Sequence, residues 1–407
     1  MSYEMDAAGA RRLDEYFQLI ENQLKGRKKR ESFAIYAMGI LGEGERKSAE
    51  PIAARICGDP VKTKRMHDKL LHFLARAVWS DRAVRETAAK YVTEVISERE
   101  EISTWVIDDT GFLKQGEHSV GVQRQYTGTA GKITNCQVAV SLCVASSTVH
   151  VPIDFELYLP ESWANDPERR HAVRIPDAVA FKTKTELALE MVERAVEAGI
   201  PGRIILADSA YGDCATFRNT LRLLGFDYAV GIKRGTSVVP VDNSGTHRGP
   251  MLTAVDLAQS LSPRKYRRIT WRDGTKTSLS SRFAVVRVKT SHEKHKPMEQ
   301  RDAEWLIIEW PEGEDAPTKF ALSTLPNRTT KKALVRILKE RWRTEQMYAE
   351  LKGELGLDHF EGRSFPGWHH HVSVVICCAA FVVAERVRFF SSSQRRPNTA
   401  STHTVAA

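Results

Sequence analysis

Hydrophobic positions along the chain change their period twice, and the changes divide the sequence into parts. In residues 1–100 apolar side chains recur every three or four positions, as in Leu13, Phe17, Ile20 and Leu24, which predicts amphipathic helices. From residue 103 onward, short runs rich in Val, Ile and Leu predict strands that first follow one another and then alternate with helices. The expected strands are 104–107, 136–145, 149–159, 203–207 and 226–232, and the expected helices are 184–198 and 213–224.

Residues 236–325 differ from both neighbouring parts. They combine turn signals such as Asp273-Gly274 with alternating segments such as 282–289, which predicts a β-rich insertion. Strong helix formers over 331–355 and an apolar stretch over 372–389 predict two further helices. The fold class that follows is α/β, a mixed sheet with a β-rich insertion, preceded by a helical N-terminal domain. The expected boundaries are 1–100, 101–235, 236–325 and 326–390, with a disordered tail at 391–407.

The amino-acid composition indicates in which cellular compartment the protein is expected. The chain has 407 residues, of which 42% are hydrophobic and 27% charged, so a large core is expected. Its longest apolar run, over 372–384, is shorter than the roughly 20 residues that a membrane span requires. The first residues contain no apolar segment of the kind found in secretory signals, and the six cysteines show no C-x-x-C spacing. We therefore expect a cytoplasmic protein without disulfides or membrane spans.

Positive charge is concentrated in one short part of the chain. The net charge is +9, and the segment from Pro263 to Arg301 alone holds twelve Lys or Arg against three Asp or Glu. Tyr266 and Trp271 lie among these cations, a pattern that favours contact with a phosphate backbone over an ordinary solvated face. The residues predicted to contact DNA here are Arg264, Lys265, Arg267, Arg268 and Arg272.

A smaller basic run lies in the helical N-terminal part. Lys28, Lys29 and Arg30 follow one another there, and a second basic stretch lies around Lys64. Such a run fits either a solvated helix face or a DNA-contacting helix. We predict that residues 1–100 form a helical DNA-binding domain and that these three cations contact DNA.

Three acidic residues are distinguished by where the predicted elements place them. Asp109 and Asp208 each end a buried strand, and Glu345 lies in the middle of the 331–355 helix. Carboxylates at the ends of adjacent strands, facing a carboxylate on a packed helix, form an all-oxygen site suited to Mg²⁺ or Mn²⁺. Each acid alone also fits a turn, a cap or a surface ion pair. Asp108 is the rival to Asp109, since successive strand residues face opposite sides and only one can face the metal.

These motifs carry a family resemblance. The segments 107–110 (Ile-Asp-Asp-Thr) and 206–212 (Leu-Ala-Asp-Ser-Ala-Tyr-Gly) resemble the strand-end motifs of the DDE transposases of bacterial insertion sequences. The third motif resembles the Tyr-x2-Arg-x3-Glu-x6-Lys signature of one branch, with Arg341, Glu345 and Lys352 at its last three positions. The Tyr position falls on Leu338, a departure from the signature that leaves the acidic residues intact.

The resemblance implies a fold, a chemistry and partners. It implies a ribonuclease-H-like core in which Asp109, Asp208 and Glu345 hold two Mg²⁺ (or Mn²⁺) ions and act as the catalytic residues. Arg341 and Lys352 would contact DNA phosphates near the cleaved end, and the Asp-Thr pattern favours Asp109 over Asp108. The implied activity is cut-and-paste transposition on double-stranded DNA, at terminal inverted repeats and in target DNA. A homodimer in the synaptic complex and a bacterial, nucleoid-associated location when bound to DNA are also implied.

Two other functions stay open at this point. The chain could be a DNA-binding regulator that keeps the fold without catalysis, or a related nuclease acting on another nucleic acid. Weaker features do not change this choice. His359 and the run His369, His370 and His371 fit no standard zinc spacing, and Trp271 and Trp368 are interpreted as core tryptophans in preference to base-stacking ones.

Overall fold

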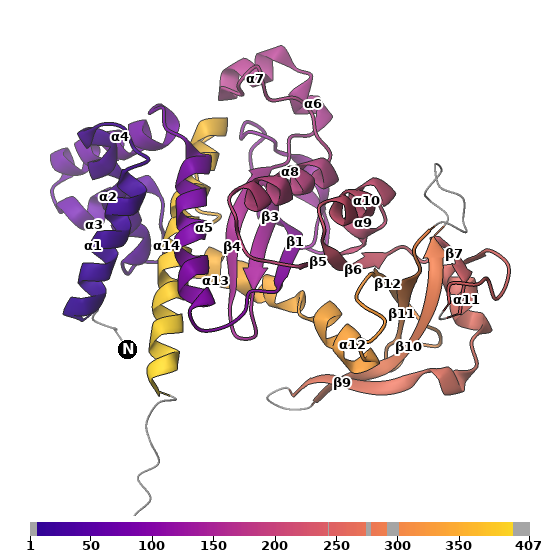
Figure 1. The fold of residues 1–407 in the computed structure, drawn as a ribbon. Helices are drawn as coiled ribbons and strands as arrows, with labels where there is room; N and C mark the ends of the chain where they lie inside the picture. Colours follow the sequence, from indigo (N-terminus) through magenta and orange to yellow (C-terminus); the bar gives the residue numbers. More distant parts are fainter. Residues whose placement is uncertain (1–5, 243, 274–277, 291–300, 394–407) are drawn as a thin grey trace, which may run out of the picture.

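The N-terminal helices surround the long C-terminal helix. In this computed structural model, which describes residues 6–242, 244–273, 278–290 and 301–393, helices α1 to α5 lie at one end of the molecule, with α14 beside them (Figure 1). Asp6, Asp59 and Ser80 accept hydrogen bonds from backbone N–H groups at the starts of α1, α4 and α5, as N-caps do. The bounds are α1 Ala7–Glu21, α2 Arg27–Leu41, α3 Ala49–Cys57, α4 Pro60–Ala75, α5 Asp81–Ser97 and α14 Phe365–Ser393.

A mixed sheet forms the centre of the molecule. Strand β1 lies between β3, to which it is antiparallel, and β5, to which it is parallel; β5 is in turn parallel to β6. Nearly every side chain of β1 and of the C-terminal part of β3 is buried, because helices cover both faces of this part of the sheet. The bounds are β1 Thr104–Leu113, β2 Gln123–Thr127, β3 Lys132–Ala145, β4 His150–Leu157, β5 Ile204–Ala207 and β6 Asp227–Ile232.

Residues of the predicted β-rich insertion extend this sheet. Strand β12 pairs antiparallel with β6, and β11, β10 and β7 follow in order, with β9 pairing along β10. The insertion therefore shares backbone hydrogen bonds with the core, at the end of the molecule away from α1–α5 (Figure 1). Its elements are β7 Ser237–Pro240, β8 Leu252–Thr253, α11 Ala254–Ser260, the 3₁₀ turn η1 Pro263–Lys265, β9 Arg267–Asp273, β10 Ser278–Thr290, β11 Glu304–Trp310 and β12 Lys319–Ser323.

The remaining helices complete the ribonuclease-H-like arrangement that the sequence predicts. Helix α8 contacts β3 and β4 from one face, and α13 contacts β1 and β4. Thr183 and Glu186 form a capping box that fixes the start of α8. The bounds are α6 Glu161–Ala164, α7 Pro167–Val173, α8 Lys184–Glu197, α9 Ser209–Gly212, α10 Ala215–Leu223, α12 Lys331–Lys339 and α13 Trp342–Gly353.

Two predicted elements differ from the structure in ways that matter for the site. Strand β1 continues through Asp109 to Leu113, so Asp109 lies inside the strand and the prediction that it ends the strand is wrong. The helix expected over 331–355 is two helices, because the carbonyls of Glu340 and Arg341 accept hydrogen bonds from the N–H groups three residues on, those of Arg343 and Thr344.

The end of the chain also differs from its prediction. Helix α14 begins at Phe365 and so includes the histidine run, ahead of the expected start at 372. Residues 391–393 of the expected disordered tail belong to α14, and the rest of the tail lies outside the described residues. None of the helices in the described ranges has the length and hydropathy that a membrane span requires. All six cysteines are free thiols.

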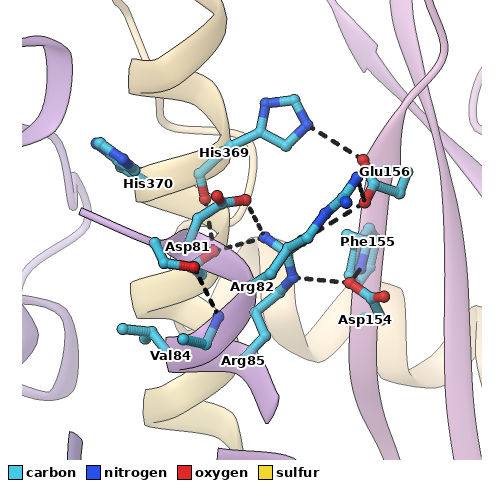
Figure 2. A network of polar contacts seen from close by, with 12 residues as sticks. Asp81, Arg82, Val84, Arg85, Asp154, Phe155, Glu156, His369 and His370 are labelled. Carbon is cyan, nitrogen blue, oxygen red and sulfur yellow. Dashed lines mark hydrogen bonds and ion pairs between the residues drawn. The ribbon is translucent and has the colours of Figure 1, made fainter. Parts of the chain in front are cut away.

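A buried ion network, defined here as Asp81, Arg82, Arg85, Asp154, Glu156, Arg194 and His369, joins the N-terminal helices to the sheet (Figure 2). Arg85 of α5 lies at its centre, with Nε 2.7 Å from Asp154 Oδ1 on β4 and Nη1 2.7 Å from Asp81 Oδ2. The same Nη1 donates to Ser373 Oγ on α14 at 2.8 Å. One guanidinium thus ties together α5, β4 and α14.

Candidate active site

Strand β1 presents two consecutive carboxylates at the centre of the sheet. Asp108 pairs with Ser141 and Asp109 with Val140 on β3, so the two side chains point to opposite faces. Asp108 lies on the face covered by α13, and Asp109 on the face of α8. Both are partly shielded, with 12% of the Asp108 side chain and 19% of the Asp109 side chain exposed.

The parallel pairing of β1 with β5 places Asp208 beside Asp108 and Asp109. Ile107 of β1 is the partner of Ala207 of β5, so Asp208 follows at the level of Asp108. Asp208 keeps an extended backbone (φ −82°, ψ −173°) and its Oδ1 accepts the Ala210 N–H at 2.8 Å as the N-cap of α9. The predicted position of Asp208 at a strand end is therefore what the structure has.

Helix α13 is fastened to β1 by the cations of the third motif. Arg341 Nη1 lies 2.5 Å from Asp108 Oδ2. Eleven residues further along, Lys352 Nζ donates to Thr110 Oγ1 at 2.9 Å and to the Gly111 carbonyl at 2.7 Å. The spacing of three turns of helix thus brings both cations to one strand.

The charges around Asp108 shift its pKa and that of its partner. Burial raises the pKa of Asp108 to about 6, and the neighbouring carboxylates of Asp208 and Asp109 add to this rise, while Arg341 opposes it. The pKa of Arg341 is raised although burial alone would lower it, because Asp108, Asp208 and Glu345 all act on the guanidinium. Arg341 is thus bonded to Asp108 and feels the charge of Asp208 and Glu345 as well.

Asp109 has different partners on the other face. Its Oδ2 lies 2.9 Å from Lys184 Nζ, at the start of α8, and 3.5 Å from the hydroxyl of Tyr211 on α9. Burial raises the pKa of Tyr211 well above its ordinary value, and the carboxylates of Asp109, Asp108 and Asp208 contribute in that order. The Tyr211 hydroxyl therefore bonds Asp109 and is influenced by the charge of all three aspartates.

Glu345 is exposed on α13, four residues after Arg341. In the described part of the chain, no three His, Cys, Asp or Glu side chains are close enough to hold one metal ion together. Asp108 and Asp109 are instead each paired with a cation, Arg341 and Lys184 respectively. Their donor atoms are all carboxylate oxygens, which is the chemistry that Mg²⁺ and Mn²⁺ prefer, so the residues present fit these ions in kind.

Apart from Arg341 and Lys352, which lie at β1, the predicted DNA contacts lie at two ends of the molecule, in the insertion and in the N-terminal helices (Figure 1). In the basic hairpin, defined here as η1, β9 and β10, Arg264, Lys265 and Arg267 are exposed. Arg268 is paired with Glu312 at 2.8 Å, and the guanidinium of Arg272 stacks on the ring of Trp342, 3.8 Å from its centroid. Part of the basic stretch, including residues 274–277 and 291–300, lies outside the described residues.

The basic run of the N-terminal helices begins α2. Lys29 Nζ donates to the Val78 carbonyl at 2.9 Å, and Arg30 Nε donates to the Leu24 carbonyl at 3.0 Å, so these two cations hold neighbouring segments together. Lys28 is exposed. Their predicted contact with DNA remains a prediction.

Three residues that surround the site were missed or set aside by the sequence reasoning. Lys184 carries no motif of its own, and only the Asp109 contact reveals it. Tyr211 lies in the second motif, but the sequence does not indicate that its hydroxyl bonds Asp109. Trp342 directly follows Arg341, and its position in the sequence does not indicate that it will contact Arg272 of β9.

The histidine run serves packing within the described residues. His370 stacks on Trp79 and bonds the Leu74 carbonyl, and His371 bonds the Tyr36 hydroxyl at 2.9 Å. His369 lies beside Glu156 in the buried ion network (Figure 2). Trp368 is 1% exposed and packs on Phe112, which confirms its interpretation as a core residue.

Comparison with known proteins places this geometry in a family. Residues 20–278 match the family model described as DDE superfamily endonuclease. The chain belongs to this family of DDE endonucleases. The matched range includes Asp109 and Asp208 and ends before Arg341, Glu345 and Lys352, so the third motif is supported by the structure around β1 and not by the match.

One relative of this chain is described as a transposase. The chain is 28% identical over 222 residues to a protein of Microchaete diplosiphon described as a probable transposase for insertion sequence element IS701. The alignment covers 54% of this chain and 53% of that protein, so this DDE endonuclease spans about half the length of the relative it matches. The resemblance to DDE enzymes of insertion sequences is thereby confirmed.

Proposed function

We propose that the protein is a transposase that cleaves DNA at the ends of an insertion sequence and joins those ends to target DNA, in cut-and-paste transposition. One observation carries this proposal. The Arg341–Lys352 face of a helix is bonded to the same strand that holds Asp108 and Asp109, and that strand is hydrogen-bonded to the strand leading into Asp208. The acids and cations that phosphodiester chemistry needs thus meet at the centre of one sheet.

The carboxylates divide into two roles. Asp109, Asp208 and Glu345 would hold two Mg²⁺ (or Mn²⁺) ions, with Asp109 reaching them from the face of α8 and Glu345 from α13 on the other face. When bound, the ions would supply a nucleophile and stabilise the leaving oxygen of an in-line displacement. Asp108 instead orients Arg341, since its Oδ2 accepts from that guanidinium and its Oδ1 accepts the backbone N–H of Asp109 at 2.9 Å. Asp108 thus has one donor on each carboxylate oxygen, whereas Lys184 and Tyr211 both bond the Oδ2 of Asp109.

The cations of the site prepare it for DNA. Lys184 neutralises Asp109, and its own side chain is 29% exposed, so it can turn toward solvent when another cation takes its place. Arg341 and Lys352 give the site two positive charges at the face where a phosphate backbone would approach. The partner is double-stranded DNA, both inverted repeats and target, bound by a homodimer that brings two ends together. The protein would act in the bacterial cytoplasm at the nucleoid.

Cleavage of DNA carrying the terminal repeats, with Mg²⁺, tests the proposal. Glu345→Gln and Asp208→Asn are expected to reduce cleavage to background while DNA binding persists. Glu350→Gln is the matched control, because Glu350 is a carboxylate of the same helix that pairs with Arg386, away from β1. Full activity of the Glu345→Gln and Asp208→Asn proteins would refute the assignment.

A catalytically silent DNA-binding regulator is the second candidate, and one observation favours it. Lys184 and Arg341 occupy Asp109 and Asp108, so the carboxylates of the described chain are not gathered around a single point. Binding of Mn²⁺, followed by electron paramagnetic resonance in the wild type and in Asp208→Asn, separates the two. A transposase loses bound Mn²⁺ on substitution, while a silent regulator binds none at this site in either form.

A further inference from the structure

The basic hairpin contains an irregularity at the residue nearest the active-site helix. Along the β9–β10 ladder, Leu279 pairs with Arg272 and Ser280 pairs with Thr270, so Trp271 is left without a partner. In a regular strand Trp271 and Arg272 would point to opposite faces. An extra residue of this kind bends the strand and changes where its side chains point.

Both side chains of this bulge reach the junction of α12 and α13. Lys339, the last residue of α12, places its Nζ 4.7 Å from the ring centroid of Trp271, and the same Nζ lies 2.6 Å from Glu309 Oε2 on β11. The next residue of β9, Arg272, stacks on Trp342, the first residue of α13. A strand of the insertion thus contacts the end of one helix and the start of the next.

The junction between these two contacts contains the signature arginine. Residues 340 and 341 separate α12 from α13, and Arg341 reaches from this point to Asp108 on β1. Lys339 and Trp342, the residues on either side of this junction, both contact the bulge. Movement of β9 would therefore move both ends of the junction together, and with them the first turn of α13 that carries Glu345.

We propose that the bulge at Trp271 and Arg272 is a positioning device, which couples contact of the basic hairpin with DNA to the placement of Arg341 and Glu345. The proposal rests on the function proposed above. Trp342 and Arg272 are its positioning residues, acting through the α12–α13 junction. Since stacking uses the face of the guanidinium, the N–H edge of Arg272 stays available for a phosphate.

The hairpin itself provides a matched control. Arg282 of β10 stacks on Trp310 with its guanidinium carbon 3.9 Å from the ring centroid, a geometry close to that of Arg272 on Trp342. The Arg282–Trp310 stack joins β10 to β11 and so lies within the insertion. Loss of either stack removes one cation–π interaction, but only the Trp342 stack connects to α13.

Two measurements on the full-length protein test the coupling. Hydrogen exchange of the free protein should show the amides of residues 341–346 exchanging about tenfold faster in Trp342→Ala, and unchanged in Trp342→Tyr and Arg282→Ala. The single-turnover cleavage rate at saturating DNA should fall about tenfold in Trp342→Ala, while the Kd for DNA changes less than threefold. Trp342→Tyr should restore the rate, because a tyrosine ring also stacks on a guanidinium.

The outcomes separate this inference from the proposed function. An equal loss of rate in Arg282→Ala and Trp342→Ala, or a loss confined to DNA affinity, would overturn the coupling. So would unchanged exchange at 341–346 in Trp342→Ala. A wild-type protein that cleaves no DNA, yet shows the exchange difference, would refute the transposase proposal and leave the mechanical link between β9 and α13 in place.

Discussion

Two clusters of charge lie on the central sheet, and their carboxylates are shifted in opposite directions. In the buried ion network burial alone would raise the pKa of Asp81, but Arg85 and His369 outweigh it and lower that pKa to about 2. At the candidate active site the pKa of Asp108 is raised to about 6, because burial and two neighbouring aspartates outweigh Arg341. Both acids are shielded from water, so the balance of charge around each decides the direction.

The two clusters differ in how fully their carboxylates are paired with cations: the buried ion network stabilises the fold, whereas the candidate site keeps carboxylates that can bind a ligand. In the network, Asp154 has a guanidinium on each oxygen, Arg85 at 2.7 Å on one and Arg194 at 2.7 Å on the other. At the candidate site four carboxylates, those of Asp108, Asp109, Asp208 and Glu345, stand against three cations, Lys184, Arg341 and Lys352, and Glu345 is exposed. A surplus of carboxylate at a partly open position is the condition in which a divalent cation binds favourably.

The largest effect on stability is expected from removing the central cation of the buried ion network. Arg85→Ala leaves Asp154 and Asp81 without their central cation, and removing one partner of a buried ion pair costs about 3–5 kcal/mol in free energy of unfolding. Arg82→Ala is the control, because the Arg82 side chain is 56% exposed and pairs with Glu156 from the rim. We expect a loss below about 1 kcal/mol there. Urea unfolding measures both; equal losses would contradict the central role of Arg85.

Acid is expected to destabilise the same end of the molecule through buried histidines. Burial lowers the pKa of His370 and of His371 to about 4, from an ordinary value of 6.5. Below pH 6.5 the unfolded chain takes up protons that the folded chain does not, so stability is complete above 6.5 and falls as the pH approaches 4. Each histidine contributes about 1.4 kcal/mol per pH unit in this window.

This pH dependence is measured as the free energy of unfolding between pH 7.5 and 5. His371→Gln should lower the slope of the unfolding free energy against pH by the contribution of one proton, since glutamine does not titrate. His171→Gln, at an exposed position of α7, is the control and should leave the slope as it is. A slope that His371→Gln leaves unchanged would show that His371 does not titrate differently on folding.

The basic hairpin is expected to give a smaller and more graded effect. Arg264→Glu, Lys265→Glu and Arg267→Glu combined should weaken DNA binding uniformly across sequences. They should also flatten the dependence of log K on log salt by about one unit for each phosphate that the variant no longer neutralises. The exposed Arg11→Glu change on α1 serves as a control for net charge. Unchanged affinity and salt slope in the triple variant would mean that the hairpin is a solvated face.

Local pattern was enough to predict most elements and the order of the acids. The strand leading to Asp208 and the helix beginning at Lys184 are where hydrophobic periodicity and capping residues place them. The Arg-x3-Glu-x6-Lys spacing likewise brings Arg341 and Lys352 to one strand, since it follows from helix geometry alone.

Features that depend on pairing between distant segments could not be read from the sequence. Strand β1 extends to Leu113 because β3 offers partners along its whole length, as far as Cys136 opposite Leu113. The break before α13 depends on contacts of Trp342 with a strand about 70 residues earlier. Lys184 meets Asp109 only because α8 packs across the sheet. In each case tertiary contact, and not local preference, sets the result.

The choice between Asp109 and Asp108 tests the account most directly. Mg²⁺-dependent cleavage of terminal-repeat DNA should be compared in Asp109→Asn and Asp108→Asn, with DNA affinity measured on the same proteins. We predict that Asp109→Asn abolishes cleavage with near-normal binding, and that Asp108→Asn, which weakens only the hold on Arg341, retains a reduced rate. Loss of cleavage in Asp108→Asn together with an active Asp109→Asn protein would contradict the account and make Asp108, which faces α13, the metal ligand of β1 in place of Asp109.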